Sequence, residues 1–486
     1  MRLPMMCKRV VTAVGATALV MALPVPSATA RQGPAERPPS MAKPPPLEPG
    51  FKVPDGTTTP DTAYNKTTDC IGSLNQGSVD LKNMPWGQIQ LRFDELHRFA
   101  TGKGVLVGVI DTGVKPHPYF EGRVRGGGDF VIPGDNGLLD CDGHGTEVAG
   151  IIAAKPPEDS DIGFKGIAPD AQILSIRQSS NNYKGKIVVP GGDPAGEERT
   201  AGNLDTLARA VVAAADAGVS VLNMSVDNCR PVSQGGIQPA EKNLQAALRY
   251  AFEQKNVVLV ASAGNTGEHG CPDATNGTDP TNPTHIVTPP WFAEHVISVA
   301  AMDRSGDPAA FSVQGPWVTV AAPGTEIISL DPAPSSNGLA NLQVLQDGTR
   351  SDIRGTSFAA PYVAGLAALI RERYPSLSAR QVTERIKITA SHPAAPGGRD
   401  NLVGHGMINP IGALTTMIPS EQGVVADEAL NMRMDMPAPH VKNWAPMQVA
   451  IIGSGGGVLL LLLTLFIVHT VRRNRPDHNP GPRGSA

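Results

Sequence analysis

The sequence predicts an α/β fold, in which a parallel β-sheet carries helices on both faces, followed by one C-terminal transmembrane helix. Between about Trp86 and Ile418, apolar runs of strand length alternate with amphipathic helical patterns. Repeated strand, helix, strand order indicates a parallel sheet with right-handed crossovers. Near the C-terminus, twenty uncharged residues from Val449 to Val468 are long enough to cross ~30 Å of hydrocarbon.

Composition excludes several classes of protein. Apolar residues make up 41% of the chain and charged residues 18%, which is typical of a globular protein and excludes global disorder, collagen and coiled coil. The net charge of -4 gives no sign of a polyanionic partner, so no nucleic-acid binding is expected. The sequence has no P-loop and no GxGxxG, which argues against nucleotide-driven functions.

The N-terminus indicates export. Residues 1–30 combine basic residues, a short apolar run and small residues before Ala30, which predicts a secretory signal peptide; the alternative is an N-terminal membrane anchor. Residues 31–85 form a proline-rich extension with nine prolines between positions 31 and 60, so it should lack a core of its own. It is a linker, a pro-segment or an arm laid over the main domain.

The main domain is expected to span residues 86–418. We predict buried parallel strands at Val105–Ile110, Ile173–Ile176, Val219–Val226, Val257–Ala261 and Val296–Ala300, and helices at Thr206–Ala217 and Glu241–Gln254. Functional sites of such sheets gather at the carboxyl ends of the strands.

Three side chains predict acyl-transfer chemistry at that edge. Asp111 ends a predicted strand, His144 opens a helical stretch, and Ser357 stands at the start of an apolar helix in which we expect Pro361 to be tolerated near the first turn. A hydroxyl nucleophile, an imidazole base and a carboxylate that orients the imidazole are the groups this chemistry needs. Asn265, after small residues at the end of another strand, is a candidate oxyanion donor.

These segments also carry a family resemblance. VIDTGV, DGHGTEVAG, ASAGNTG and GTSFAAPYVAG resemble, in order, the four sequence blocks of the subtilisin-like serine proteases. The resemblance implies a subtilisin-like fold, the catalytic triad Asp111, His144 and Ser357, and Asn265 as oxyanion donor. It also implies a substrate-binding strand in LNMSV. The predicted substrate-binding residues are Ser225, Val226 and Asp227 at the end of this strand, and Gly264 directly before Asn265.

The order of segments along the chain is similar to that of the mycosins, the membrane-anchored subtilases of type VII secretion systems. These segments are a signal peptide, a proline-rich N-terminal arm, a subtilase domain with four cysteines, one C-terminal membrane helix and a short basic tail. That resemblance implies an endopeptidase that cleaves a restricted set of exported proteins and belongs to the secretion machinery. An alternative is a mainly structural subunit of the membrane complex, with proteolysis secondary. The resemblance to the mycosins also implies that the N-terminal extension is an ordered segment wrapped around the protease and resembles a removable inhibitor less.

Two positions depart from the common subtilase pattern. Glu147 stands where many subtilases have a second histidine, outside the triad. Asp227 follows Ser225 and Val226 where many subtilases have glycine, so the cleft should be narrower and more acidic.

Four cysteines lie in the exported part, which suggests two disulfides in an oxidising compartment. Four cysteines permit three pairings, and we favour Cys70 with Cys141 and Cys229 with Cys271. The rival interpretation is zinc, but no CxxC or HExxH occurs, so no metal or other cofactor is expected; no calcium site can be placed either.

The C-terminal segments predict the topology. A linker at 419–446 precedes the transmembrane helix at 447–470 and a basic tail at 471–486, whose arginines favour a cytoplasmic position. The catalytic domain then faces the extracytoplasmic side of the inner membrane. Three long polar segments are expected to be loops that restrict access to the cleft: Ser179–Thr200, Thr266–Pro290 and Asp331–Ser351.

Overall fold

The computed structural model describes residues 41–72, 74–75, 81–187, 196–272, 276, 279, 281–344, 348–423 and 444–474. The predicted signal peptide lies outside these residues, as do most of the predicted linker and tail. The chain divides into two compact units, Met1–Glu421 and Gln422–Ala486.

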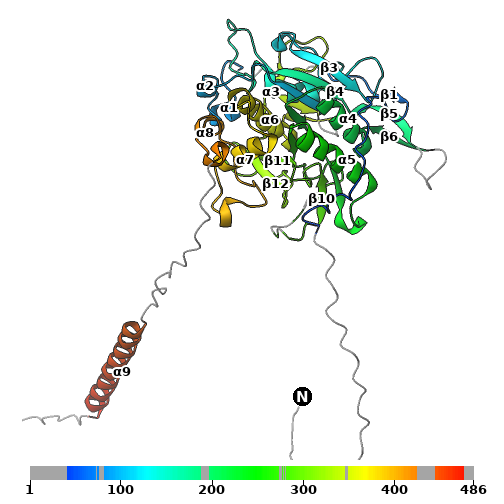
Figure 1. The fold of residues 1–486 in the computed structure, drawn as a ribbon. Coiled ribbons are helices and arrows are strands. Elements are labelled where there is room, and N and C mark those ends of the chain that lie inside the picture. The colour runs from blue at the N-terminus through cyan, green and yellow to red at the C-terminus, as the bar shows by residue number, and fades with distance from the viewer. Residues whose placement is uncertain are drawn as a thin grey trace, which may run out of the picture. The chain divides into compact units, whose positions relative to one another are not determined.

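A seven-stranded parallel sheet forms the centre of the first unit (Figure 1), as the sequence predicts. All six neighbouring strand pairs in it are parallel. In spatial order the strands are β12 (Val318–Pro323), β11 (Val296–Met302), β9 (Val258–Ser262), β7 (Val221–Met224), β2 (Leu106–Asp111), β4 (Gln172–Arg177) and β3 (Val124–Asp129).

The five predicted strands are present, and the structure adds β3 and β12. The sequence of β3, VRGGGD, has three consecutive glycines and hardly any apolar residue, so it gives no strand pattern. In β12 the apolar run ends in two alanines and Pro323, which can lie at the edge of a sheet because it needs no ladder partner there.

Two helix groups cover the sheet. Helices α3 (His144–Ala153) and α6 (Thr356–Arg373) pack together, as do α4 (Leu204–Asp216) and α5 (Pro239–Arg249), and α3, α4 and α6 all contact β2 (Figure 1). The predicted helix at Glu241–Gln254 is α5 followed by one π-helical turn, Tyr250–Gln254. The other α-helices among the described residues of the unit are α1 (Trp86–Gln90), α2 (Phe93–Leu96), α7 (Ala379–Thr389) and α8 (Pro410–Thr415).

Smaller antiparallel ladders flank the sheet. One contains β1 (Tyr64–Lys66), β5 (Ser180–Ile187) and β6 (Glu197–Ala201); the others pair β8 (Asn228–Pro231) with β10 (His285–Thr288), β13 (Ser329–Leu330) with β14 (Leu339–Ala340), and β15 (Leu342–Val344) with β16 (Arg350–Asp352). The prediction of a loop at Ser179–Thr200 was therefore wrong for most of its described residues. Strands β5 and β6 are polar and have no apolar pattern in the sequence. They are stabilised by main-chain pairing with each other, and β5 also pairs with β1.

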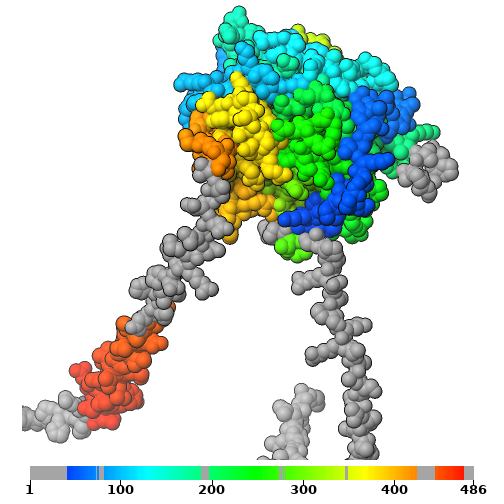
Figure 2. Space-filling view, viewed as in Figure 1, coloured from blue at the N-terminus to red at the C-terminus, as the bar shows by residue number. Residues whose placement is uncertain are grey.

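The proline-rich extension is an arm laid over the domain. In Figure 2 its dark-blue atoms run along the green surface that contains α4 and α5. Several hydrogen bonds or ion pairs hold it there: Trp291 Nε1 to Met41 O (2.9 Å), Gln245 Nε2 to Pro45 O (2.9 Å), Lys242 Nζ to Glu48 Oε1 (2.7 Å) and Arg209 Nη2 to Thr59 O (2.9 Å). The described part of the arm is thus held in place by its contacts with the domain.

The second unit contains α9 (Ala445–Arg473). Within the part of the chain that the structure describes, this is the one helix long and apolar enough to cross a membrane. It extends the predicted span of 447–470 by a few residues at each end.

Candidate active site

A cleft of about 690 Å³ opens at the carboxyl ends of the central strands. It brings together segments that are distant in the sequence, since Asp111 and Ser357, 246 residues apart, both line it. The other predicted site residues that line it are His144, Asn265, Ser225, Val226 and Asp227. Gly264 is not among the lining residues; it lies directly before Asn265, and its carbonyl accepts a hydrogen bond from Val313 N (2.9 Å).

Asp111 and His144 form a partly buried pair, in which the His144 side chain is 31% exposed. Asp111 is fully buried at the end of β2, and its Oδ1 lies 2.7 Å from His144 Nδ1. The same oxygen accepts the N–H of Thr112 (2.8 Å). With Nδ1 facing the carboxylate, the Nε2 atom of the imidazole is the one free to act as a base.

The charge state of His144 follows from this contact. Burial by itself lowers the pKa of His144, but the charge and hydrogen bond of Asp111, helped by Glu147 and Asp140, outweigh burial and raise it to about 9. Burial also holds the pKa of Glu147 well above its usual range, although the charge of His144 opposes this.

Asp140 holds the loop that leads into α3. Its carboxylate accepts hydrogen bonds from Thr112 Oγ1 (2.9 Å), Gly143 N (2.7 Å) and Thr146 N (2.8 Å). Gly143 has a φ of 91°, a conformation that favours glycine, and His144 follows it as the first residue of the helix. Asp140 therefore fixes the direction from which the imidazole enters the cleft.

The position of Ser357 depends on a proline. Pro361 is the sixth residue of α6, so the prediction that it lies near the first turn was slightly off. Because proline has no N–H, the carbonyl of Ser357 loses its partner within the helix. That carbonyl accepts instead from Ser225 Oγ (2.7 Å), and Asn223 Nδ2 donates to Ser225 Oγ (2.9 Å).

The ring of Phe358 connects Ser357 to the histidine. Its centroid lies 5.1 Å from that of the His144 imidazole, so α6 and α3 meet at the two predicted catalytic residues. Ser357 itself is 6% exposed and stands at the N-terminal end of α6, where backbone N–H groups favour negative charge.

The side chain of Asn265 has a fixed orientation. Thr356 donates two hydrogen bonds to Asn265 Oδ1, from its N and from its Oγ1, each 3.0 Å long. A backbone N–H requires an acceptor, so the oxygen must face Thr356 and the amide Nδ2 must face the cleft. There Nδ2 donates to Glu268 Oε2 (3.0 Å).

Asp227 lies against Gly264 beside the cleft. Its side chain is 1% exposed, and Oδ2 lies only 3.2 Å from the point where a Cβ on Gly264 would stand. Asp227 Oδ1 accepts from His269 Nδ1 (3.2 Å), and this bond, partly opposed by burial, raises the pKa of His269.

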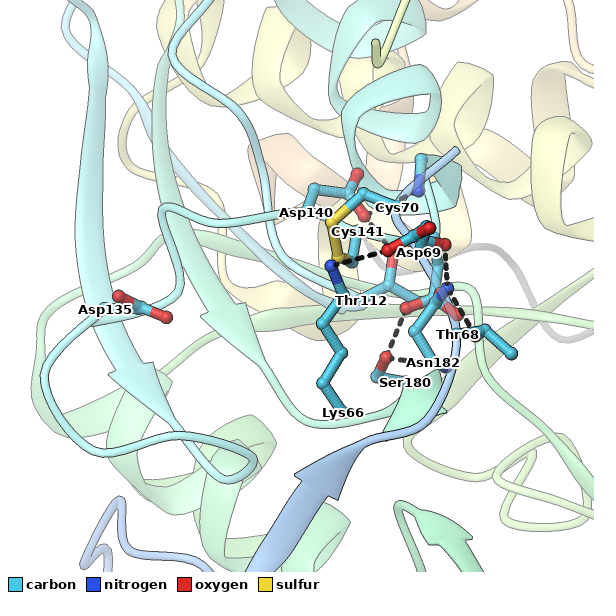
Figure 3. Close-up of a disulfide and its surroundings, with 12 residues drawn as sticks. Lys66, Thr68, Asp69, Cys70, Thr112, Asp135, Asp140, Cys141, Ser180 and Asn182 are labelled. Carbon is cyan, nitrogen blue, oxygen red and sulfur yellow. Dashed lines mark hydrogen bonds and ion pairs between the residues drawn. A yellow bond between two sulfur atoms is a disulfide. The ribbon is translucent and has the colours of Figure 1, made fainter. Parts of the chain in front are cut away.

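Thr68 and Asp69 of the arm line the cleft, and the arm is bonded to the loop before His144 through Cys70 and Cys141 (Figure 3). A disulfide joins Cys70 to Cys141, and Asn182 Nδ2 donates to Thr68 Oγ1 (2.8 Å) and to Asp69 O (2.7 Å). A second disulfide joins Cys229 to Cys271, which leaves none of these four cysteines for a zinc site.

Asp142 connects the loop before His144 to the start of β5. Its Oδ1 accepts from Asn181 N (2.7 Å), and its Oδ2 accepts from the Ser180 hydroxyl. Burial, partly offset by these bonds, raises the pKa of Asp142 to about 6. Among the described residues no group of three or more His, Cys, Asp or Glu side chains is arranged to hold a metal ion.

Sequence reasoning missed Asp140, Asp142, Glu268 and His269 as residues of the site. Asp140 and Asp142 flank Cys141 just before His144, and Glu268 and His269 follow Asn265 within four residues. Polar residues that close to a predicted catalytic residue were the available signal.

Comparison with known proteins places this geometry in a family. The model of the Subtilase family matches residues 102–406. Mycosin-1 of Mycobacterium tuberculosis is 43% identical over 393 residues, which cover 79% of this chain and 84% of that protein.

Two solved structures are similar over most of the chain. One is the structure of "a serine protease MycP1, an essential component of the type VII (ESX-1) secretion system", with a TM-score of 0.69 and 39% identity over 77% of this chain and 100% of that one. The other is a chain of "an intact ESX-5 inner membrane complex", with a TM-score of 0.71 and 35% identity over 88% of this chain and 100% of that one.

Proposed function

The chain belongs to the subtilase family of serine peptidases and, within it, to the mycosins, and from this premise we propose that Asp111, His144 and Ser357 are its catalytic triad. The observation that carries the proposal is the 2.7 Å contact between Asp111 Oδ1 and His144 Nδ1 in a cleft that Ser357 also lines. Asn265 is the proposed oxyanion donor because its Nδ2 is directed into that cleft.

The proposed reaction is peptide hydrolysis through an acyl-enzyme. Ser357 Oγ attacks the peptide carbonyl while His144 Nε2 takes the hydroxyl proton, and Asn265 Nδ2 donates to the resulting oxyanion. His144 then returns the proton to the leaving amine as the peptide bond breaks. A water molecule, deprotonated by His144, releases the acyl group and restores Ser357.

We propose that the protein cleaves a restricted set of substrates. Ser225, Val226 and Asp227 form one wall of the cleft, and the Asp227 carboxylate occupies space that glycine would leave open. A buried carboxylate in this position disfavours large apolar side chains and acidic ones at the residue preceding the cut.

Asp227→Gly should therefore widen the range of cleaved peptides. In a library of peptides that vary at the residue preceding the cut, we expect the ratio of kcat/KM for phenylalanine over alanine to rise about tenfold, the order of effect of one pocket contact. An unchanged ratio in a folded variant would show that Asp227 does not limit this pocket.

We also propose that the protein works at the inner membrane, with its peptidase domain on the extracytoplasmic side, as part of a type VII secretion complex. Support comes from the similar chain in the ESX-5 inner membrane complex and from α9, which ends in Arg472 and Arg473 and is soon followed in the sequence by Arg475. The proposed segments are those of the sequence prediction: signal peptide 1–30, extension 31–85, peptidase domain 86–418, linker 419–446, membrane helix 447–470 and tail 471–486.

A second candidate function is structural support of that complex, which the same similarity favours. Two variants of the full chain separate the roles in a strain that lacks the native gene. Ser357→Ala should abolish cleavage and leave secretion intact if support dominates. Loss of secretion in Ser357→Ala would instead make proteolysis the main role. Replacing 447–470 by an unrelated membrane helix keeps the anchor and tests whether the sequence of α9 itself contributes to support of the complex.

A further inference from the structure

We propose that Glu268 restrains the oxyanion donor of this protease, so that acylation runs below the rate that the catalytic residues would otherwise allow. The inference rests on the proposed role of Asn265 and Ser357. It starts from one contact, the 3.0 Å hydrogen bond from Asn265 Nδ2 to Glu268 Oε2.

The contact places a carboxylate at the group that should meet the oxyanion. The two bonds from Thr356 hold Asn265 Oδ1, so Nδ2 cannot turn away from the cleft, and Glu268 lines that cleft. Nδ2 carries two hydrogens, and a substrate oxygen can still approach it. Negative charge on Glu268 nonetheless opposes the negative charge that develops on the substrate oxygen in the transition state.

The fold holds the backbone of Glu268 in this place. Its carbonyl accepts from Cys271 N (2.8 Å), and Cys271 is bonded to Cys229 in β8. Cys229 N in turn donates to the carbonyl of His269 (3.0 Å), so this hydrogen bond and the disulfide fasten the turn to β8 at two points. The residue after Glu268 is also held by its side chain, because His269 Nδ1 lies 3.2 Å from Asp227 Oδ1.

The Glu268 side chain itself remains exposed, so it can swing into solvent when a substrate enters. Its effect is therefore a reversible restraint and does not block the site. A substrate that draws this carboxylate away gains the full donor strength of Asn265.

The test compares acylation rates in the detergent-solubilised full chain. A fluorophosphonate probe reacts with the serine hydroxyl through a transition state that carries a negative oxygen, so its second-order rate of labelling at Ser357 reports on the oxyanion donors. Glu268→Gln keeps the size and an acceptor oxygen but removes the charge. We expect it to label about tenfold faster than the parent, a fraction of the roughly 100-fold to 1000-fold effect of one whole donor.

Two further variants sharpen the result. Glu158→Gln removes a charge from an exposed residue that does not line the cleft, and its labelling rate should equal that of the parent. In an Asn265→Ala background, Glu268→Gln should bring much less acceleration, because the carboxylate acts through that amide. Thermal unfolding of each variant shows that the compared proteins are folded.

The outcomes are separable. An unchanged or slower rate in Glu268→Gln overturns the proposal, and so does an equal gain with and without Asn265. Labelling of Ser357 in the parent with no gain in the variant leaves the protease assignment standing while the restraint falls. No labelling of Ser357 in any folded variant would remove the assignment and the restraint together.

Discussion

At the scale of single residues, the site depends on side chains that compensate for what the backbone cannot supply. Pro361 deprives the Ser357 carbonyl of its helical partner, and the Ser225 hydroxyl supplies another at 2.7 Å. Asp140 plays a similar part for the loop before His144, where it accepts backbone N–H groups that α3 leaves without helical partners. Ser357 and the loop before His144 are thus held in place by hydrogen bonds with neighbouring side chains.

Ser225→Ala tests the first of these supports. The change leaves the buried Ser357 carbonyl without its partner, which costs about 1 to 3 kcal/mol of unfolding free energy. We expect a lower midpoint in denaturant unfolding and a labelling rate at Ser357 that falls about tenfold. A labelling rate and a midpoint equal to those of the parent protein would mean that the carbonyl needs no such support.

The pH dependence of acylation follows from His144. Its pKa is raised to about 9, so below that pH the imidazole is protonated and cannot act as a base. The rate of fluorophosphonate labelling at Ser357 should rise about tenfold per pH unit through neutral pH and level off above about pH 9. A plateau already reached near pH 7 would contradict the influence of Asp111 on this histidine.

The raised pKa of His144 makes folding stability depend on pH in the direction opposite to the acylation rate. A histidine whose pKa is higher in the folded protein than in the unfolded chain stabilises the fold fully below the unfolded pKa of 6.5. This contribution is lost as the pH rises through about 9. The conditions that favour the base therefore remove part of the stability that the Asp111 and His144 pair provides.

At the scale of elements, the parts with apolar periodicity were predictable and the parts built by pairing were not. The five predicted strands and both predicted helices have strong apolar patterns, and the structure contains them. In contrast β3 is rich in glycine, and β5 and β6 are polar strands that pair with each other, while β5 also pairs with β1, which lies far away in the sequence. No local pattern shows that β5 will pair with the arm.

The triad candidates could be chosen from sequence because each stands at the end of a strand or the start of a helix. Glu268 and His269 could not be given roles, since their contacts with Asn265 and Asp227 depend on a turn that the Cys229–Cys271 disulfide fastens to β8. Four cysteines permit three pairings, and the one favoured from the sequence was Cys70 with Cys141 and Cys229 with Cys271.

The arm offers a prediction at this scale. The Cys70–Cys141 bond joins residues 71 positions apart and ties the arm to the loop before His144. Replacing both cysteines by serine removes a cross-link worth about 4 kcal/mol for a loop of this length in the chain-entropy model. We expect a lower unfolding midpoint, measured beside a serine replacement of the Cys229–Cys271 pair; an unchanged midpoint would show that the arm is held by its other contacts alone.

At the scale of the whole molecule, the chain combines a peptidase unit with a separate apolar helix. The first unit holds every residue of the candidate site, and the second holds α9. Chemistry and attachment are therefore assigned to different parts of one chain. This division is consistent with two roles in one protein, cleavage by the first unit and membership of a membrane complex through the second.

Covalent labelling of Ser357 decides whether Asp111, His144 and Ser357 form a working triad. The full chain in detergent is treated with a fluorophosphonate probe beside Ser357→Ala, and the modified peptide is mapped by mass spectrometry. We expect labelling at Ser357, none in Ser357→Ala, and a much slower reaction in His144→Ala. Labelling at another residue, or none at Ser357 in a protein shown to be folded, would contradict the triad.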